Sequence, residues 1–212
     1  NRRVNRQEWV CPPRKRAGRE QRRLQYMKTT KKVIVPLAPG FEEVEALTVV
    51  DILRRAGADV VVAGTIEGPI EGRSRIRVAP DRLLDAALAS GDFDMVVLPG
   101  GAPGTENLAK NPHVKYLIER LGALGRPIAA ICAATTVLSA SGLTKGKRVT
   151  GHPSVWDRLD AGEVVDERVV VDSNIVTSQG PGTAMEFAFA LVKVLFGEAK
   201  AEEVNKGVLA RI

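Results

Sequence analysis

Cys132 is the side chain of this 212-residue sequence whose position most favours covalent chemistry. It lies in the segment AAICAAT (129–135), directly after an apolar predicted strand and before a predicted helix. Small neighbours permit the strained strand-to-helix turn of a nucleophile elbow, and the N–H groups of the following helix favour a thiolate. A lone cysteine is, however, most often a small buried hydrophobe. Its position alone leaves Cys132 open between a nucleophile and a core residue.

Backbone groups near this elbow could bind a substrate oxygen. Gly100 and Gly101 follow a predicted strand, where the main chain can approach a ligand closely, and they could form an oxyanion pocket with the Ala133 amide. A Pro-Gly-Gly sequence can equally serve only to turn the chain. Pro181 lies in a rigid Gly-Pro-Gly-Thr loop that could form a wall of the same pocket, or be no more than a turn before a helix.

Glu45 and His152 are the candidates for proton transfer. Glu42, Glu43 and Glu45 open a predicted helix, where acids ordinarily interact with the helix dipole, and we assign Glu42 and Glu43 to that role. Glu45 lies at a different angle and could point towards Cys132, where partial burial would keep its carboxyl protonated. His152 follows a predicted strand in a Gly-His-Pro turn, where a general base could lie, although most histidines in turns have no catalytic role.

These residues follow the ends of predicted secondary-structure elements. From residue 31 onward, short apolar runs alternate with segments of helical length. Strands are expected at 33–37, 60–63, 95–98 and 128–131, a hairpin within 65–80, short strands within 148–177, and helices at 42–56, 83–90, 112–124, 133–141, 186–196 and 199–209. The alternation predicts an α/β fold with a mostly parallel central sheet covered by helices on both faces. Ligands bind beyond the carboxyl ends of such strands, which is where the candidate residues lie.

The formal net charge of +6 is concentrated at the start of the sequence. Residues 1–26 hold eight arginines and one lysine against two glutamates, a net charge of +7, which leaves −1 for residues 27–212. We expect 1–26 to be a disordered basic extension outside the fold, and Met27 to be the natural start of one domain over 27–212. A targeting peptide and a nucleic-acid-binding arm are the alternatives for the extension.

The composition excludes several classes of protein. No apolar run approaches the roughly 18 residues of a membrane-spanning helix, so no membrane partner is expected. Two cysteines in 212 residues cannot form a disulfide framework, which favours a reducing, cytoplasmic location. Two histidines and no Cys/His cluster give no metal site, and no nucleotide-binding glycine fingerprint is present. We therefore expect no cofactor, and no nucleic-acid partner apart from contacts of the basic extension.

Five segments, taken in their order along the chain, carry a family resemblance. They are PGFEEVEALTVVDILRRAG (39–57), VVLPGG (96–101), AAICAAT (129–135), VTGHPS (149–154) and VTSQGPGTAMEFA (176–188). With these segments the sequence resembles the ThiJ/PfpI superfamily, in its DJ-one/YajL-like branch. The resemblance runs from about residue 31 to residue 210 and implies a flavodoxin-like three-layer sandwich that forms homodimers.

The resemblance also implies roles for single residues. Cys132 matches the reactive cysteine of the family, Glu45 the protonated glutamate beside it, and His152 a nearby histidine. Gly101 and Ala133 match the backbone donors around the sulfur. The family includes glutathione-independent glyoxalases, deglycases of glyoxal- and methylglyoxal-modified molecules, and redox-responsive chaperones.

The chain departs from the family pattern at two places. Arg73-Ser74-Arg75 replaces the usual Ser-Arg pair, which leaves the arginine near the pocket unassigned. Thr135 stands where proline is common after the elbow, and since threonine can also start a helix we expect little consequence.

Three functions follow from these residues. The first is cofactor-independent detoxification of reactive 2-oxoaldehydes or glycated adducts, in which Cys132 adds to the aldehyde, Glu45 and His152 move protons, and water releases a hydroxyacid such as lactate. The second is a redox-sensing, chaperone-like protein whose cysteine is oxidised to the sulfinic acid. The third is a PfpI-like peptidase, against which Ala133 stands where those relatives carry a histidine.

Overall fold

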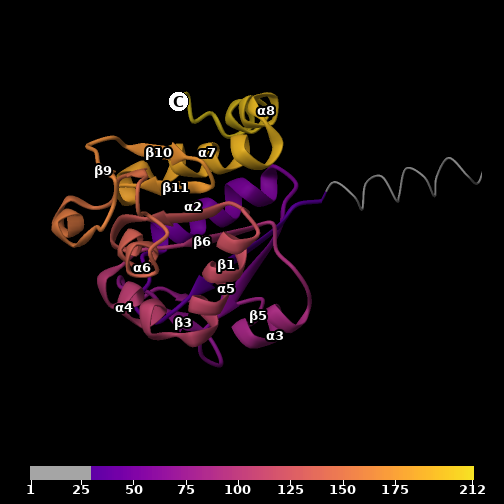
Figure 1. Cartoon of the computed structure of the whole chain (residues 1–212). Coiled ribbons are helices and arrows are strands. Elements are labelled where there is room, and N and C mark those ends of the chain that lie inside the picture. Colours follow the sequence, from indigo (N-terminus) through magenta and orange to yellow (C-terminus); the bar gives the residue numbers. More distant parts are fainter. Residues whose placement is uncertain (1–29) are drawn as a thin grey trace, which may run out of the picture. The chain divides into compact units, whose positions relative to one another are not determined.

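The computed structural model describes residues 30–212, and a seven-stranded sheet lies at the centre of this part (Figure 1). The strand order is β10 (Val169–Asp172), β11 (Ile175–Ser178), β7 (Ile128–Ile131), β6 (Met95–Leu98), β1 (Lys32–Leu37), β2 (Asp59–Gly64) and β5 (Arg82–Leu83). All neighbours are parallel except β10 and β11. The predicted mostly parallel α/β sheet is confirmed. The predictions on residues 1–26 lie outside the described residues.

Helices cover both faces of this sheet. One face packs against α2 (Glu43–Arg55), α7 (Ala184–Phe196) and α8 (Glu198–Val208), and the other against α3 (Leu84–Ala89), α4 (Ala102–Lys110), α5 (Pro112–Ala123) and α6 (Thr135–Ala140). Strand β1 shows why two cores form, because Val33 and Val35 point into the first cluster while Ile34 points into the second. The three-layer sandwich is therefore present.

Two small sheets lie outside the central one. Strands β3 (Ile70–Glu71) and β4 (Arg77–Val78) pair antiparallel, which confirms the hairpin predicted within 65–80. Strands β8 (Arg148–Val149) and β9 (Glu163–Val164) pair parallel, and a 3-10 helix, η2 (Pro153–Arg158), lies between them in the chain.

Helix α4 is absent from the sequence-based prediction, because its Pro103-Gly104 pair reads as a turn. Proline is tolerated in the first turn of a helix, since the N–H it lacks has no partner there. Gly104 allows the helix to approach the preceding loop closely: a Cβ at this position would lie 2.6 Å from the Phe41 nitrogen. Pro103 is thus compatible with the first turn of α4, and the close approach to Phe41 requires glycine at position 104.

The buried face of helix α2 agrees only in part with the face that its apolar residues indicate. The sequence predicts one broad buried face that consists of Val44, Leu47, Val50, Ile52 and Leu53. Val50, Ile52 and Leu53 are buried, but Val44 is 50% exposed and Leu47 is 38% exposed. Glu43 and Glu45 are buried instead. Glu43 Oε1 accepts hydrogen bonds from two backbone N–H groups of the β3–β4 hairpin, those of Ser74 at 2.8 Å and Ile76 at 3.3 Å. Glu43 lies in the first turn of α2, as its assignment to the helix dipole requires. Its burial, which the sequence did not indicate, is permitted by donors distant in sequence.

Glu42 is also buried rather than solvent-exposed. Its Oε2 lies 3.4 Å from Nη1 of Arg73, whose side chain belongs to the loop between β3 and β4. The first turn of α2 is thus covered by this loop. Within residues 30–212, no helix combines the length and the apolar character needed to cross a membrane.

Candidate active site

Cys132 occupies a strained turn between a strand and a helix, as the sequence predicts. It follows β7 and opens the 3-10 helix η1 (Cys132–Ala134), which continues into α6. Its φ is 63°, in the left-handed region that side chains other than glycine rarely adopt. Such a conformation persists where the surrounding structure enforces it, and it is frequent at reacting residues. The turn leaves 9% of Cys132 exposed.

The Glu45 carboxyl lies next to this cysteine and is fully buried. Its Oε2 accepts a hydrogen bond from the Gly100 N–H at 2.7 Å, and its Oε1 has no hydrogen-bond partner in the part of the chain that the structure describes. Burial raises the pKa of Glu45 to about 7, while the Gly100 N–H and hydrogen bonding with Cys132 act in the opposite direction. This carboxyl can therefore both accept and release a proton near neutral pH.

The Cys132 thiol is held protonated by the same environment. Burial, and secondly the charge of an ionised Glu45, raise the pKa of the thiol to about 12, while the N–H groups of Ala133 and Gly101 lower it. The low pKa expected from the helix N-terminus is therefore wrong, because burial outweighs the two N–H groups. Since a carboxylate and a thiolate repel each other here, the pair keeps one proton above pH 7, shared between Glu45 and Cys132.

Gly100 holds the two groups together but is not a free oxyanion donor, because its N–H is engaged by Glu45. A Cβ on Gly100 would lie 2.6 Å from Glu45 Oε2 and 2.7 Å from Cys132 Cβ. The Gly101 and Ala133 N–H groups, which act on the sulfur, remain the donors available to an oxygen formed beside it.

Substitution of Gly100 by alanine is expected to destabilise the protein by about 1–3 kcal/mol, because the added methyl group has no space between two buried side chains. The measurement is urea unfolding followed by circular dichroism. Gly182→Ala is the matched control, since a Cβ there meets nothing within 4 Å. Equal stability of the two variants would contradict the close packing at Gly100.

His152 reaches the site through its backbone. Its N–H donates to the Cys132 carbonyl oxygen at 3.3 Å. Its ring Nδ1 accepts a hydrogen bond from the Ser154 N–H at 3.2 Å and lies 2.7 Å from Ser154 Oγ. The tautomer in which Nδ1 is the acceptor of both has its ring proton on Nε2. Among the described residues, no hydrogen bond joins this exposed ring to the sulfur. In that tautomer His152 offers a hydrogen-bond donor at Nε2.

Pro181 lies in the short 3-10 helix η3 (Pro181–Thr183) before α7 and is exposed. A Cβ on the neighbouring Gly180 would lie 3.7 Å from Cδ2 of His152, which places this loop beside the histidine. The structure thus brings Glu45, Gly101 and Ala133 to Cys132. His152 contacts Cys132 through its backbone, and Pro181 is at the edge of the group.

Arg73 is a residue near the site that the sequence left unassigned. Its charge lowers the pKa of Glu45, although burial of that carboxyl has the larger, opposite effect. It is exposed and paired with Glu42, so it is accessible to an anionic ligand. The Arg-Ser-Arg departure from the family pattern was the available signal, but it did not indicate which arginine faces the site.

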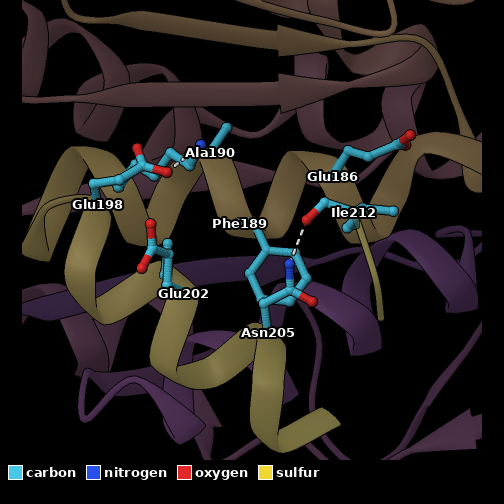
Figure 2. A pocket seen from close by; sticks show the side chains of 9 residues that line it. Glu186, Phe189, Ala190, Glu198, Glu202, Asn205 and Ile212 are labelled. Carbon is cyan, nitrogen blue, oxygen red and sulfur yellow. Dashed lines mark hydrogen bonds and ion pairs between the residues drawn. The ribbon is translucent and has the colours of Figure 1, made fainter. Parts of the chain in front are cut away.

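A separate cavity of about 250 Å³ lies between α7 and α8 (Figure 2). Its lining includes Glu186, Phe189, Glu198 and Asn205, and none of the predicted site residues. Two of its carboxylates are already paired, Glu198 with Lys193 at 2.8 Å and Glu186 with Arg168 at 2.7 Å. In residues 30–212 no group of three or more His, Cys, Asp or Glu side chains is placed to hold a metal ion. The reactive groups are therefore those around Cys132.

Known proteins share the fold and much of the sequence of this chain. The model of the DJ-1/PfpI family matches residues 31–194, the segment that holds both the sheet and the cysteine elbow. The chain belongs to the DJ-1/PfpI family. Among DJ-1 relatives, protein dj-1beta of Drosophila melanogaster is 44% identical over 183 residues, which are 85% of this chain and 97% of that protein. Its crystal structure covers 85% of this chain and 98% of its own, with 43% identity and a TM-score of 0.81.

Other DJ-1/PfpI relatives differ in name and in length. The glutathione-independent glyoxalase DJR-1.2 of Caenorhabditis elegans is 36% identical over 183 residues, 85% of this chain and 97% of that protein. Protein DJ-1 homolog A of Arabidopsis thaliana is 40% identical over 182 residues, 85% of this chain. The chain spans only 46% of the length of this Arabidopsis relative.

Proposed function

We propose that the chain is a cysteine-dependent, cofactor-independent glyoxalase that acts on methylglyoxal, glyoxal or their adducts. The observation that carries the proposal is the buried pair of Cys132 and Glu45, in which a carboxyl with a pKa of about 7 adjoins a thiol in a strained turn. The name of the C. elegans relative as a glutathione-independent glyoxalase supports it. Aldehydes are electrophilic by themselves, so this chemistry requires no metal.

The first step is addition of sulfur to the aldehyde carbon. As the bond between Sγ of Cys132 and C1 of methylglyoxal forms, the thiol proton passes to ionised Glu45. The aldehyde oxygen becomes an alkoxide that accepts hydrogen bonds from the Gly101 and Ala133 N–H groups. Because the pKa of Glu45 is about 7, the carboxylate needed for this step is present at neutral pH.

The second step is an internal redox reaction between the two carbons. Glu45 first passes the thiol proton to the C1 alkoxide and is thereby ionised again. It then removes the proton bound to C1, which leaves an enediolate, and returns that proton to C2. The C1 hydroxyl proton passes to the C2 oxygen, to which His152 Nε2–H donates a hydrogen bond. C1 is thereby oxidised to a thioester and C2 reduced to an alcohol, so no outside oxidant is consumed. Water then breaks the bond between sulfur and C1, releases lactate and restores the thiol.

Lactate formation from methylglyoxal without glutathione tests this function. The purified protein is expected to consume methylglyoxal and release one lactate per aldehyde, measured with an enzyme-coupled lactate assay. A parallel assay for free amine on preformed methylglyoxal adducts tests deglycase activity. Absence of both products would contradict the proposed function.

Cysteine oxidation is the second candidate, because a protonated Glu45 could donate a hydrogen bond to a sulfinate at Cys132. The raised pKa of the thiol and its low exposure act against ready oxidation. Intact mass after mild peroxide treatment separates the two functions. Addition of two oxygens at Cys132 in a protein that forms no lactate would favour the sensor.

A homodimer through α2 is proposed as the assembly. Val44 and Leu47 expose apolar side chains one helical turn apart on this helix, close to the chain segment that carries Glu45. The double substitution Val44→Asp and Leu47→Asp is expected to shift the protein from dimer to monomer in light scattering. Met185→Asp, which changes a similarly exposed apolar side chain at the start of α7, is the control for the position of the interface and should leave the dimer intact. A dimer that persists in the double variant would contradict an α2 interface.

A further inference from the structure

The segment Thr150–His152 is held in place by side chains and backbone of distant elements. Its Thr150 N–H donates to Thr177 Oγ1 at 2.9 Å, and its Thr150 carbonyl accepts from Thr135 Oγ1 at 3.0 Å. The Gly151 carbonyl accepts from Trp156 Nε1 at 2.8 Å, and the His152 N–H donates to the Cys132 carbonyl at 3.3 Å. Four hydrogen bonds thus fix the short segment that carries His152.

The Thr135 hydroxyl is the contact that joins this segment to the helix of the cysteine elbow. Threonine hydroxyls in helices commonly bond to a carbonyl of the preceding turn, as Thr136 Oγ1 does with Ala133 O at 2.7 Å. The neighbouring Thr135 instead reaches Thr150, fifteen residues away. Both Thr135 and Thr150 are fully buried, so water cannot readily replace the bond.

Close packing supports the same contact. A Cβ on Gly151 would lie 3.1 Å from the Cys132 carbonyl oxygen and 3.2 Å from Thr135 Oγ1. The segment therefore lies directly against both the elbow and the first residue of α6. On the other side, Thr177 of β11 holds the Thr150 N–H from within the sheet. The segment is fixed between two buried threonines.

We propose that Thr135 is a positioning residue for His152: its hydroxyl holds the Thr150–His152 segment at the Cys132 elbow. The catalytic readout of this inference rests on the proposed glyoxalase function. The physical reason is that a buried Thr150 carbonyl without its donor must find another partner, and the segment shifts as it does so. Because His152 is two residues further on, a small shift moves its ring relative to the bound substrate.

Thr135→Val tests the proposal because valine keeps the branched shape and removes only the hydroxyl. We expect kcat for lactate formation to fall about tenfold, with KM within about twofold, since the effect acts on proton transfer rather than on binding. Thr135→Ser should restore kcat. Thr105→Val is the matched control, because the Thr105 hydroxyl is also buried but has no hydrogen-bond partner in the described structure. Its kcat should equal that of the wild type.

Coupling to His152 separates positioning from a general loss of stability. If Thr135 acts through His152, the double variant Thr135→Val, His152→Ala should be no slower than His152→Ala by more than about twofold. Effects that multiply would overturn the proposal. Thr177→Val, which removes the acceptor of the Thr150 N–H, provides a second variant should Thr135→Val fold poorly, and the same coupling is expected of it.

The histidine NMR spectrum gives a readout that does not need activity. The sequence contains two histidines, so His113 is an internal reference for the ring Cε1–H signal of His152. Thr135→Val should move the His152 signal and leave the His113 signal in place. If the wild type forms no lactate and Thr135→Val still moves the His152 signal, the glyoxalase function is contradicted and the positioning role is supported. An unmoved His152 signal with unchanged kcat would overturn the positioning role alone.

Discussion

Replacement of Cys132 by serine is expected to lower kcat/KM for methylglyoxal by about a thousandfold or more. A serine hydroxyl is a far weaker nucleophile than a thiol, and a carboxylate with a pKa of about 7 cannot generate an alkoxide from it. The oxyanion donors Gly101 and Ala133 would remain, so the loss isolates the sulfur. Lactate formation by the purified protein in glutathione-free buffer is the measurement.

The chain supplies its own control for this substitution. Cys11→Ser makes the same chemical change at the other cysteine of the sequence and is expected to retain the wild-type rate. A Cys132→Ser protein that keeps a rate within twofold of the wild type would falsify covalent chemistry at Cys132. Loss of lactate in Cys132→Ser with no loss in Cys11→Ser would support the addition of Cys132 sulfur to the aldehyde.

The placement of Cys132 could be predicted because it depends on local sequence. An apolar strand, a cysteine and a run of alanines are enough to indicate a strand-to-helix turn, and the observed φ of 63° agrees with the strain that such a turn requires. The alternation of strands and helices likewise fixes a parallel sheet, and with it the edge where the loops meet. Residues within a few positions of a strand end are therefore accessible to sequence-based reasoning.

Burial raises the pKa of Glu45, as the sequence-based prediction of a protonated carboxyl requires. The raised pKa of the Cys132 thiol could not be predicted, because it depends on groups distant in sequence. The N–H of Gly100 reaches Glu45 across 55 residues, and burial raises the pKa of Cys132 against the helix N-terminus that suggested a thiolate. The three acids at the start of α2 show the same limit. The contacts of Glu43 are with a later hairpin, whose backbone N–H groups it binds. Glu45 instead lies beside the Cys132 thiol and accepts from Gly100.

The Thr135 contact is of the same kind. Its sequence context suggests only the start of a helix, and the departure from proline was expected to matter little. The hydroxyl becomes informative once Thr150, fifteen residues further on, is seen to accept its hydrogen bond. The hydrogen-bond partner of a side chain depends on the tertiary structure, and the hydrophobic periodicity of the sequence does not predict it.

Glu45→Gln is expected to abolish a dependence of stability on pH that the wild type shows. The pKa of Glu45 is raised from 4.5 to about 7 in the folded state by burial, so the folded protein binds this proton more tightly than the unfolded chain. The resulting stabilisation is fully present below pH 4.5 and is lost as pH rises through about 7. The loss amounts to about 3 kcal/mol, since each unit of pKa difference corresponds to about 1.4 kcal/mol.

The measurement is the free energy of unfolding in urea between pH 4 and pH 8, compared between the wild type and Glu45→Gln. Other titrating groups contribute equally to both proteins, so the difference between the two curves isolates Glu45. That difference should shift by about 3 kcal/mol in favour of Glu45→Gln as pH rises. The shift should persist when Cys132→Ala is introduced into both proteins, because burial and not the thiol is its main cause. A difference that stays flat from pH 4 to pH 8 would mean that folding leaves the proton affinity of this carboxyl unchanged, and Glu45 could then not serve as the neutral-pH proton acceptor of the reaction.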